Sequence, residues 1–116
     1  MSDKRYVAVV GFRHLYGRKI FKPEQIVKLV KEPDNAFDDE AIRVELKPIG
    51  KVGYVANSTN TVPRGCYSAG RIYDTFDRFC YGIVRFVTKE TVIVELLDKI
   101  RMQIVLVETG TIHQSN

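Results

Sequence analysis

The chain has 116 residues and a formal net charge of +4, and 45% of its residues are hydrophobic. This length suits one domain with a single core, and no segment reaches the roughly 18 consecutive apolar residues of a membrane helix. We therefore expect one cytoplasmic domain spanning residues 1–116, with no export signal and no membrane partner.

The charges are distributed unevenly along the chain. Residues 1–31 contain eight Lys or Arg and two acidic residues, residues 32–50 contain two and six, and residues 51–116 contain eight and six. The acidic excess is therefore confined to a short segment that includes EPDNAFDDEAI, residues 32–42. A basic chain is compatible with a polyanionic partner, although charge alone does not identify one.

Seven segments have the alternating or β-branched pattern that is typical of strands. They are residues 6–12, 25–31, 41–47, 51–56, 81–88, 91–97 and 102–107. In the third, Ile42, Val44 and Leu46 are predicted to face inward, and the turn PIG should lead into the fourth. The short connection TKET, residues 88–91, predicts a second hairpin.

Residues 57–80 interrupt the strand pattern. Apolar side chains recur there at helical spacing, which predicts one helix or two short ones, capped by Ser68 or Thr61. These side chains are Val62, Cys66, Ala69, Tyr73, Phe76 and Cys80. The chain is therefore predicted to be mainly β with one or two short helices, as a small OB-like or SH3-like barrel of about six strands. The polar tail, residues 108–116, is predicted to be flexible.

Few residues point to catalysis or to a cofactor. Cys66 and Cys80 have no paired spacing, so we expect reduced thiols in the core. With only His14 and His113 as further soft ligands, a zinc site is the less favoured interpretation. No G-x-x-x-x-G-K-[ST] motif occurs, and no nucleophile has the context of a triad. We predict a binding module rather than an enzyme, without a cofactor.

The acidic segment has three interpretations. Asp34, Asp38, Asp39 and Glu40 could hold a magnesium ion for phosphodiester hydrolysis. They could instead shape a turn, because Asn35 and Asp38 have the spacing of a capping box and PDN is a turn sequence. Contact with a ligand is the third interpretation. We favour the turn, then ligand contact, over hydrolysis.

Residues 9–19, VVGFRHLYGRK, combine cations with flat side chains. Such a mixture suits single-stranded nucleic acid, because guanidinium groups hold phosphates and rings stack on bases. A solvated, charged loop explains the same residues equally well. The side chains concerned are Arg13, His14, Tyr16, Arg18 and Lys19.

Three segments resemble, in order and spacing, the HIRAN domain family, best known as a module of helicases that remodel replication forks. They are VVGFRHLYGR, VKLVKEPDNAFDDEAIRVEL and KVGYVAN. The resemblance covers about residues 6–75 and is most specific between Pro33 and Val44. The later SAGRIYD resembles the form found as free-standing small proteins in bacteria and their phages.

The resemblance implies an OB-like barrel that binds the 3′ end of single-stranded DNA, in DNA repair or replication-fork processing. By position, Arg13 and His14 correspond to a pair that grips phosphate and base, and Phe37 corresponds to a second stacking ring. Asp38 corresponds to an aspartate that accepts a hydrogen bond from the terminal sugar hydroxyl. A carboxylate disfavours a continuous phosphate backbone and suits a free hydroxyl, so it would select strand ends.

Two positions depart from the family pattern. His14 replaces a tyrosine, which gives a smaller ring that can titrate near neutral pH and should stack more weakly. Asn57 replaces a lysine of some relatives, so one phosphate contact is lost or is supplied by Lys51 or Arg64. The full set of candidate nucleic-acid contacts is Arg13, His14, Arg18, Phe37, Asp38, Lys51, Tyr54 and Asn57.

We expect single-stranded DNA or DNA 3′ ends as the partner, together with a separately encoded helicase or nuclease. A protein interaction module, in which Phe37 docks a partner, is the alternative, and a metal-dependent nuclease is the third. DNA and RNA are not distinguished, because an aspartate on the 3′-hydroxyl does not by itself exclude the neighbouring 2′-hydroxyl.

Overall fold

The computed structural model describes residues 4–12 and 17–97. The strands in these residues are β1 (Tyr6–Val10), β2 (Ile26–Lys31), β3 (Ile42–Leu46), β4 (Gly50–Val55), β5 (Phe79–Val87) and β6 (Val92–Leu97). The helical elements are η2 (Arg18–Ile20), α1 (Ala69–Ile72) and η3 (Tyr73–Thr75). The predicted strand 102–107 and the predicted flexible tail 108–116 lie outside the described residues.

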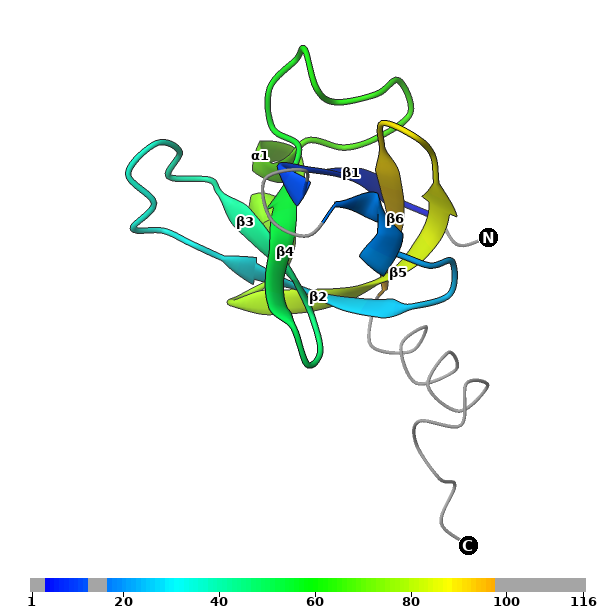
Figure 1. Ribbon diagram of the computed structural model, residues 1–116. Helices are drawn as coiled ribbons and strands as arrows, with labels where there is room; N and C mark the ends of the chain where they lie inside the picture. Colours follow the sequence, from blue (N-terminus) through cyan, green and yellow to red (C-terminus); the bar gives the residue numbers. More distant parts are fainter. Residues whose placement is uncertain (1–3, 13–16, 98–116) are drawn as a thin grey trace, which may run out of the picture.

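The strands form a closed antiparallel barrel in the order β1-β4-β3-β2-β5-β6 (Figure 1). Pairing of β1 with β6, from Tyr6 opposite Glu95 to Val9 opposite Val92, closes it. Closure is a common solution for short antiparallel strands, because it leaves no unpaired sheet edge. The predicted mainly β, OB-like barrel with a short helix is confirmed.

Alternation along the strands places the core inside the barrel. In β3, Ile42, Val44 and Leu46 are buried as predicted, whereas Arg43 and Glu45 are only partly buried. Branched aliphatic side chains from all six strands form the main core cluster. Each such side chain contributes roughly 1.5–3 kcal/mol when it is fully buried.

Both predicted hairpins are present. β3 and β4 pair from Arg43 opposite Tyr54 to Leu46 opposite Gly50, and Gly50 ends the PIG turn with a φ of +97° that favours glycine. β5 and β6 are joined through Thr88 and Thr91, which exchange backbone and hydroxyl hydrogen bonds across the TKET turn.

The helix begins where the sequence predicted. Ser68 is the N-cap of α1, and its hydroxyl oxygen accepts a hydrogen bond from the Arg71 backbone N–H at 3.2 Å. Ala69 and Ile72 of α1 are fully buried in the core cluster. This short helix therefore contributes to the closed core, and Ser68 rather than Thr61 is the cap.

The helical region is much shorter than the apolar spacing predicted. Val62 and Cys66 lie in a loop before α1, and Cys80 belongs to β5. Pro63 lacks an N–H, and Gly65 adopts a φ of +89°, so the backbone between residues 62 and 66 does not continue as a helix. The helical spacing of the outer positions was therefore coincidental.

Both cysteines are free thiols, but only one packs against the core. Cys80 does so, and burial raises the pKa of its thiol to about 12. Burial also raises the pKa of Cys66, which is partly exposed beside a surface groove. Both thiols are therefore protonated at neutral pH, and the predicted core position is wrong for Cys66.

In the part of the chain that the structure describes, no helix combines the length and the apolar character needed to cross a membrane.

Candidate nucleic-acid interface

The acidic segment forms the β2–β3 hairpin loop, which projects from one side of the barrel (Figure 1). The Asn35 side-chain oxygen accepts hydrogen bonds from the backbone N–H groups of Phe37 at 2.9 Å and Asp38 at 3.1 Å. The Asp38 carbonyl then accepts one from Ala41 N–H at 3.1 Å. The polar residues thus build a tight turn, as predicted, but no helix follows the capping-box spacing.

This turn leaves the Phe37 side chain at the surface with 98% relative exposure. The backbone N–H of Phe37 is already bonded within the turn, so the position of the residue is set by Asn35. An aromatic ring with both faces in water has stacking capacity that no intramolecular contact uses.

The adjacent Asp38 carboxylate is oriented by two donors. One oxygen accepts a hydrogen bond from Glu40 N–H at 2.9 Å, and the other accepts one from the Asn57 side-chain amide at 2.9 Å. A carboxylate has about four acceptor positions, so both oxygens retain capacity for a further donor. The side chain is partly exposed, which leaves it accessible to a ligand.

Asn57 joins this carboxylate to the start of α1. Its side-chain oxygen accepts a hydrogen bond from Gly70 N–H at 2.8 Å, while its amide nitrogen donates to Asp38. Backbone N–H groups in the first turn of a helix have no intrahelical partner, so Asn57 satisfies one of them. The structure therefore gives Asn57 a positioning role, which nothing in the local sequence indicates.

A polar network, which we call the hairpin network, occupies the base of the hairpin. Its members are Glu32, Asn35, Arg43, Lys51 and Tyr54. Glu32 accepts hydrogen bonds from Asn35 and from the Tyr54 hydroxyl, both at 3.0 Å, and lies 3.6 Å from a guanidinium nitrogen of Arg43. The Lys51 ammonium donates to the Tyr54 hydroxyl oxygen at 3.0 Å. The predicted contacts Lys51 and Tyr54 are therefore held together at the foot of the acidic loop.

The charge state of this network follows from its contacts. Burial by itself would raise the pKa of Glu32, but hydrogen bonds from Asn35 and Tyr54 and the charges of Lys51 and Arg43 lower it below the ordinary value of 4.5. The hydrogen bond to Tyr54 raises the pKa of Lys51. At neutral pH a carboxylate and two cations therefore share this site.

A polar groove of about 390 Å³ runs along the hairpin and is lined by Lys31, Glu32, Pro33, Asp34, Asn35 and Arg43. The Lys31 ammonium donates to the Phe76 carbonyl at 2.8 Å and lies over the rings of Tyr73 and Phe76. Lys31 thus ties the hairpin to the segment around η3.

The remaining predicted contacts are not all described. Arg13 and His14 lie outside the described residues, and Arg18 is described only as the first residue of η2. Gly11, which follows β1, lies beside Tyr54, because a Cβ added at Gly11 would be 4.0 Å from that ring. The chain therefore leaves β1 next to the hairpin network.

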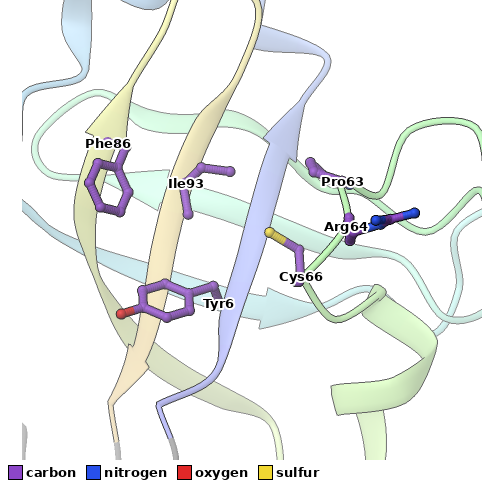
Figure 2. Close-up of a pocket in the computed structure, with 7 residues that line it drawn as sticks. Tyr6, Pro63, Arg64, Cys66, Phe86 and Ile93 are labelled. Carbon is purple, nitrogen blue, oxygen red and sulfur yellow. The ribbon is translucent and has the colours of Figure 1, made fainter.

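A second hollow, which we call the apolar groove, lies on the outer face of β1, β5 and β6 (Figure 2). It has a volume of about 240 Å³ and is lined by Tyr6, Pro63, Arg64, Gly65, Cys66, Phe86 and Ile93. Of the two residues predicted to supply a phosphate contact in place of Asn57, Arg64 lies at this groove and Lys51 lies beside Tyr54 at the base of the acidic hairpin.

The acidic residues of the hairpin do not form a recognisable metal site. In residues 4–12 and 17–97, no three His, Cys, Asp or Glu side chains are grouped so that they could hold a metal ion. Asp38 is instead bonded to Glu40 N–H and to Asn57. These contacts belong to the predicted turn of the acidic segment and to its link with Asn57.

Comparison with solved structures supports the fold. A crystal structure of a protein from Lactobacillus plantarum has 27% identity and a TM-score of 0.57, covering 81% of this chain and 93% of that chain. The crystal structure of the HIRAN domain of human HLTF is similar in fold, with 19% identity and a TM-score of 0.58, covering 93% and 87%. The comparison with curated proteins gave no match.

The family model of the HIRAN domain matches residues 4–106, which extends the resemblance seen over residues 6–75 through β5 and β6. This match includes every strand of the closed barrel and the whole acidic hairpin. The chain therefore belongs to the HIRAN domain family, which is known for DNA-binding modules.

Proposed function

We propose that this protein binds single-stranded DNA and holds the 3′-hydroxyl end in a pocket formed by Phe37 and Asp38. The observation that carries the proposal is the pairing of a ring with 98% exposure and an adjacent carboxylate that Asn57 and Glu40 N–H already orient. The Asp38 carboxylate is thus oriented before any ligand arrives, which lowers the cost of binding.

The two side chains would recognise different parts of the last nucleotide. Stacking of a base on the Phe37 ring contributes roughly 1–3 kcal/mol without strong sequence preference. The Asp38 carboxylate accepts a charge-assisted hydrogen bond from the terminal hydroxyl. In an internal nucleotide a phosphate takes the place of that hydroxyl, and its negative charge is repelled by the carboxylate.

The cations at the base of the hairpin would hold the preceding phosphates. Lys51 and Arg43 lie on neighbouring strands beside Tyr54, and Arg13 and His14 are proposed to complete this contact. Binding through phosphates weakens with salt, because each neutralised phosphate releases counterion. We place this activity in DNA repair or replication-fork processing, with a separately encoded helicase or nuclease as the partner enzyme.

A protein interaction module is the second candidate, because Phe37 and the apolar groove both expose apolar surface. In that case a protein would cover Phe37 and the charges beside it would be incidental. The two candidates differ in their response to the chemistry of a DNA terminus, which matters only to the first.

Fluorescence anisotropy with two labelled oligonucleotides that differ only in a 3′-hydroxyl or a 3′-phosphate tests the proposal. We expect the wild-type protein to favour the hydroxyl about tenfold, because a charged hydrogen bond is replaced by repulsion. Asp38→Asn should remove this preference. Asp39→Asn, which removes the same charge from the exposed neighbouring position, should keep it. Equal wild-type affinity for both termini would overturn end recognition.

A further inference from the structure

A cluster of one cation and two rings lies on the outer face of β2 and β5. Phe79 has 45% relative exposure, and its ring meets that of Tyr81 edge to face, with centroids 5.6 Å apart and planes at 85°. The Lys28 ammonium lies 4.2 Å from the centroid of the Phe79 ring. We call these three residues the Phe79 platform.

Strand register places the Phe79 platform on the same face as the hairpin network. Val30 pairs with Phe79 on one side and with Arg43 on the other, and Arg43 pairs with Tyr54. Directly paired residues project to the same side of a sheet. Since neighbouring strands are about 4.8 Å apart, the Phe79 backbone lies about 14 Å across the barrel surface from that of Tyr54.

The neighbouring row of residues on the same face contains one ring, two cations and one carboxylate. Lys28 pairs with Tyr81 on β5 and with Glu45 on β3, and Glu45 pairs with Lys51 on β4. From β5 to β4 one row is Phe79, Val30, Arg43 and Tyr54, and the other is Tyr81, Lys28, Glu45 and Lys51. The platform therefore shares this face with Arg43 and Lys51, the cations that the proposed function assigns to phosphates.

The carboxylate nearest to the platform along the strand register, that of Glu45, is paired with Arg43 at 2.6 Å rather than with Lys28. In residues 4–12 and 17–97, the Lys and Arg side chains that form ion pairs are Arg43 and Arg85, and neither Lys28 nor Arg78 does so. Arg78 is exposed and directly precedes Phe79. An exposed ring beside unpaired cations complements a ligand that has both flat apolar faces and negative charge, which is the chemistry of a nucleic-acid strand.

A single exposed phenylalanine needs no functional explanation, so the surroundings of the ring must carry the inference. Phe86, on the same strand, provides the comparison. It is 58% exposed and lines the apolar groove with Ile93 and Tyr6, and no cation lies over its ring in the described part of the chain. Phe79 differs from it in having a cation and a second ring in contact.

We propose that Lys28, Phe79 and Tyr81 form a second nucleic-acid contact, which takes a phosphate and a base several nucleotides from the strand end. This inference rests on the proposed function, because one DNA strand is to reach both the 3′-end site at Phe37 and Asp38 and the Phe79 platform. The platform itself reads neither the terminal hydroxyl nor the base sequence, because it offers ring faces and a point charge.

The test compares oligothymidylates of roughly 3 and 12 nucleotides, both with a 3′-hydroxyl, in anisotropy titrations. The wild-type protein should bind the longer strand more tightly. Phe79→Ala should weaken binding of the longer strand about fivefold or more, through the loss of one stacked base, and leave the shorter strand unaffected. Phe79→Tyr, which keeps a ring, should retain wild-type affinity for both.

Salt dependence separates the roles of the cation and the ring. Lys28→Gln should lower the slope of log K against log salt by about 0.7, the value for one phosphate of a single strand. Phe79→Ala should leave that slope unchanged. Phe86→Ala is the matched control and should change neither the affinity nor the slope, and thermal unfolding should show that each variant is folded.

The outcomes distinguish the two proposals. A length-dependent gain that Phe79→Ala removes, without any preference for the 3′-hydroxyl, would support the platform and overturn the terminal pocket. A 3′-hydroxyl preference with no effect of Phe79→Ala on the longer strand would support the terminal pocket and overturn the platform. Equal losses in Phe79→Ala and Phe86→Ala would also reject the platform.

Discussion

The basic face and the apolar groove lie on the same barrel, and both expose aromatic rings, but their rings have different neighbours. The basic face comprises Lys28, Arg43, Lys51, Tyr54, Phe79 and Tyr81 on β2 to β5, with Glu45 between Lys28 and Lys51 and the acidic hairpin at its edge. The apolar groove presents Tyr6, Phe86 and Ile93 (Figure 2). Exposure of a ring alone therefore does not mark a nucleic-acid surface, whereas a cation in contact with that ring favours one.

β5 contributes a phenylalanine to each of these surfaces because of an irregularity in its pairing. The register of β5 with β6 shifts between Val84 and Phe86, so that Arg85 is the extra residue. Such a bulge rotates the following side chains relative to the partner strand. Phe79 precedes the bulge and pairs with Val30 of β2, whereas Phe86 follows it and pairs with Ile93 of β6.

Removal of the ring at the hairpin should have the largest effect on binding. Phe37→Ala is expected to weaken binding of a 3′-hydroxyl oligonucleotide about tenfold or more, since a stacked base contributes roughly 1–3 kcal/mol. Phe86→Ala removes an equally large ring from the apolar groove and should leave the affinity unchanged. Anisotropy titrations measure both, and a larger loss in Phe86→Ala would assign binding to the groove.

Loss of the Asn57 side chain should have an intermediate effect, on stability as well as on binding. Asn57→Ala removes the hydrogen bonds to Asp38 and to Gly70 N–H, and should lower the free energy of unfolding by about 1–2 kcal/mol. It should also weaken the preference for a 3′-hydroxyl, because Asp38 loses one of its orienting donors.

Urea unfolding monitored by circular dichroism measures the stability of this variant, and anisotropy measures its preference. Asn60→Ala, in the exposed loop that follows, is the control and should change the free energy of unfolding by less than about 0.5 kcal/mol. Retention of full end preference by Asn57→Ala would show that Asp38 needs no positioning.

The smallest effect is expected from Glu32, which sets the charge of the basic face near the hairpin. Its folded-state pKa lies below the ordinary value of 4.5, so its ionised form stabilises the fold above about pH 4.5 and this contribution is lost as the pH falls through the folded-state pKa. The wild-type protein should therefore lose about 1 kcal/mol more stability on acidification than Glu32→Gln.

Urea unfolding at a series of pH values measures this difference. Asp34→Asn, which alters an exposed carboxylate of the same hairpin, is the matched control and should lose as much stability on acidification as the wild-type protein. Glu32→Gln should also bind DNA somewhat more tightly at neutral pH, because Arg43 and Lys51 are no longer partly neutralised. A weaker affinity would indicate that the contacts by which Glu32 holds Tyr54 and Arg43 in place matter more for DNA binding than its negative charge.

Much of the barrel was predictable because its determinants are local. Alternation in residues 41–47 placed Ile42 and Val44 in the core, and short turn sequences identified both hairpins. The length of the helix was not predictable from spacing, because the left-handed conformation at Gly65 depends on how the loop returns to the barrel. The exposed Phe37 and the adjacent Asp38 were identified through the family resemblance rather than through periodicity.

Contacts between distant segments were beyond any local pattern. Asp38 precedes β3 and Asn57 follows β4, so the whole β3–β4 hairpin separates them in the chain. Even so, the Asn57 side-chain nitrogen lies 2.9 Å from a carboxylate oxygen of Asp38. Lys28 and Phe79 are brought together by pairing of β2 with β5, and the sequence offers no spacing that would signal it.

By itself, the sequence determined a β-rich barrel, its two tight hairpins and an acidic turn in a basic chain, because alternation and turn chemistry act over a few neighbouring residues. Only the tertiary structure decided that Asn57 orients Asp38, that Glu32 holds Tyr54, and that Phe79 lies under Lys28. Those contacts depend on strand order and register, which barrel closure selects over the whole chain at once.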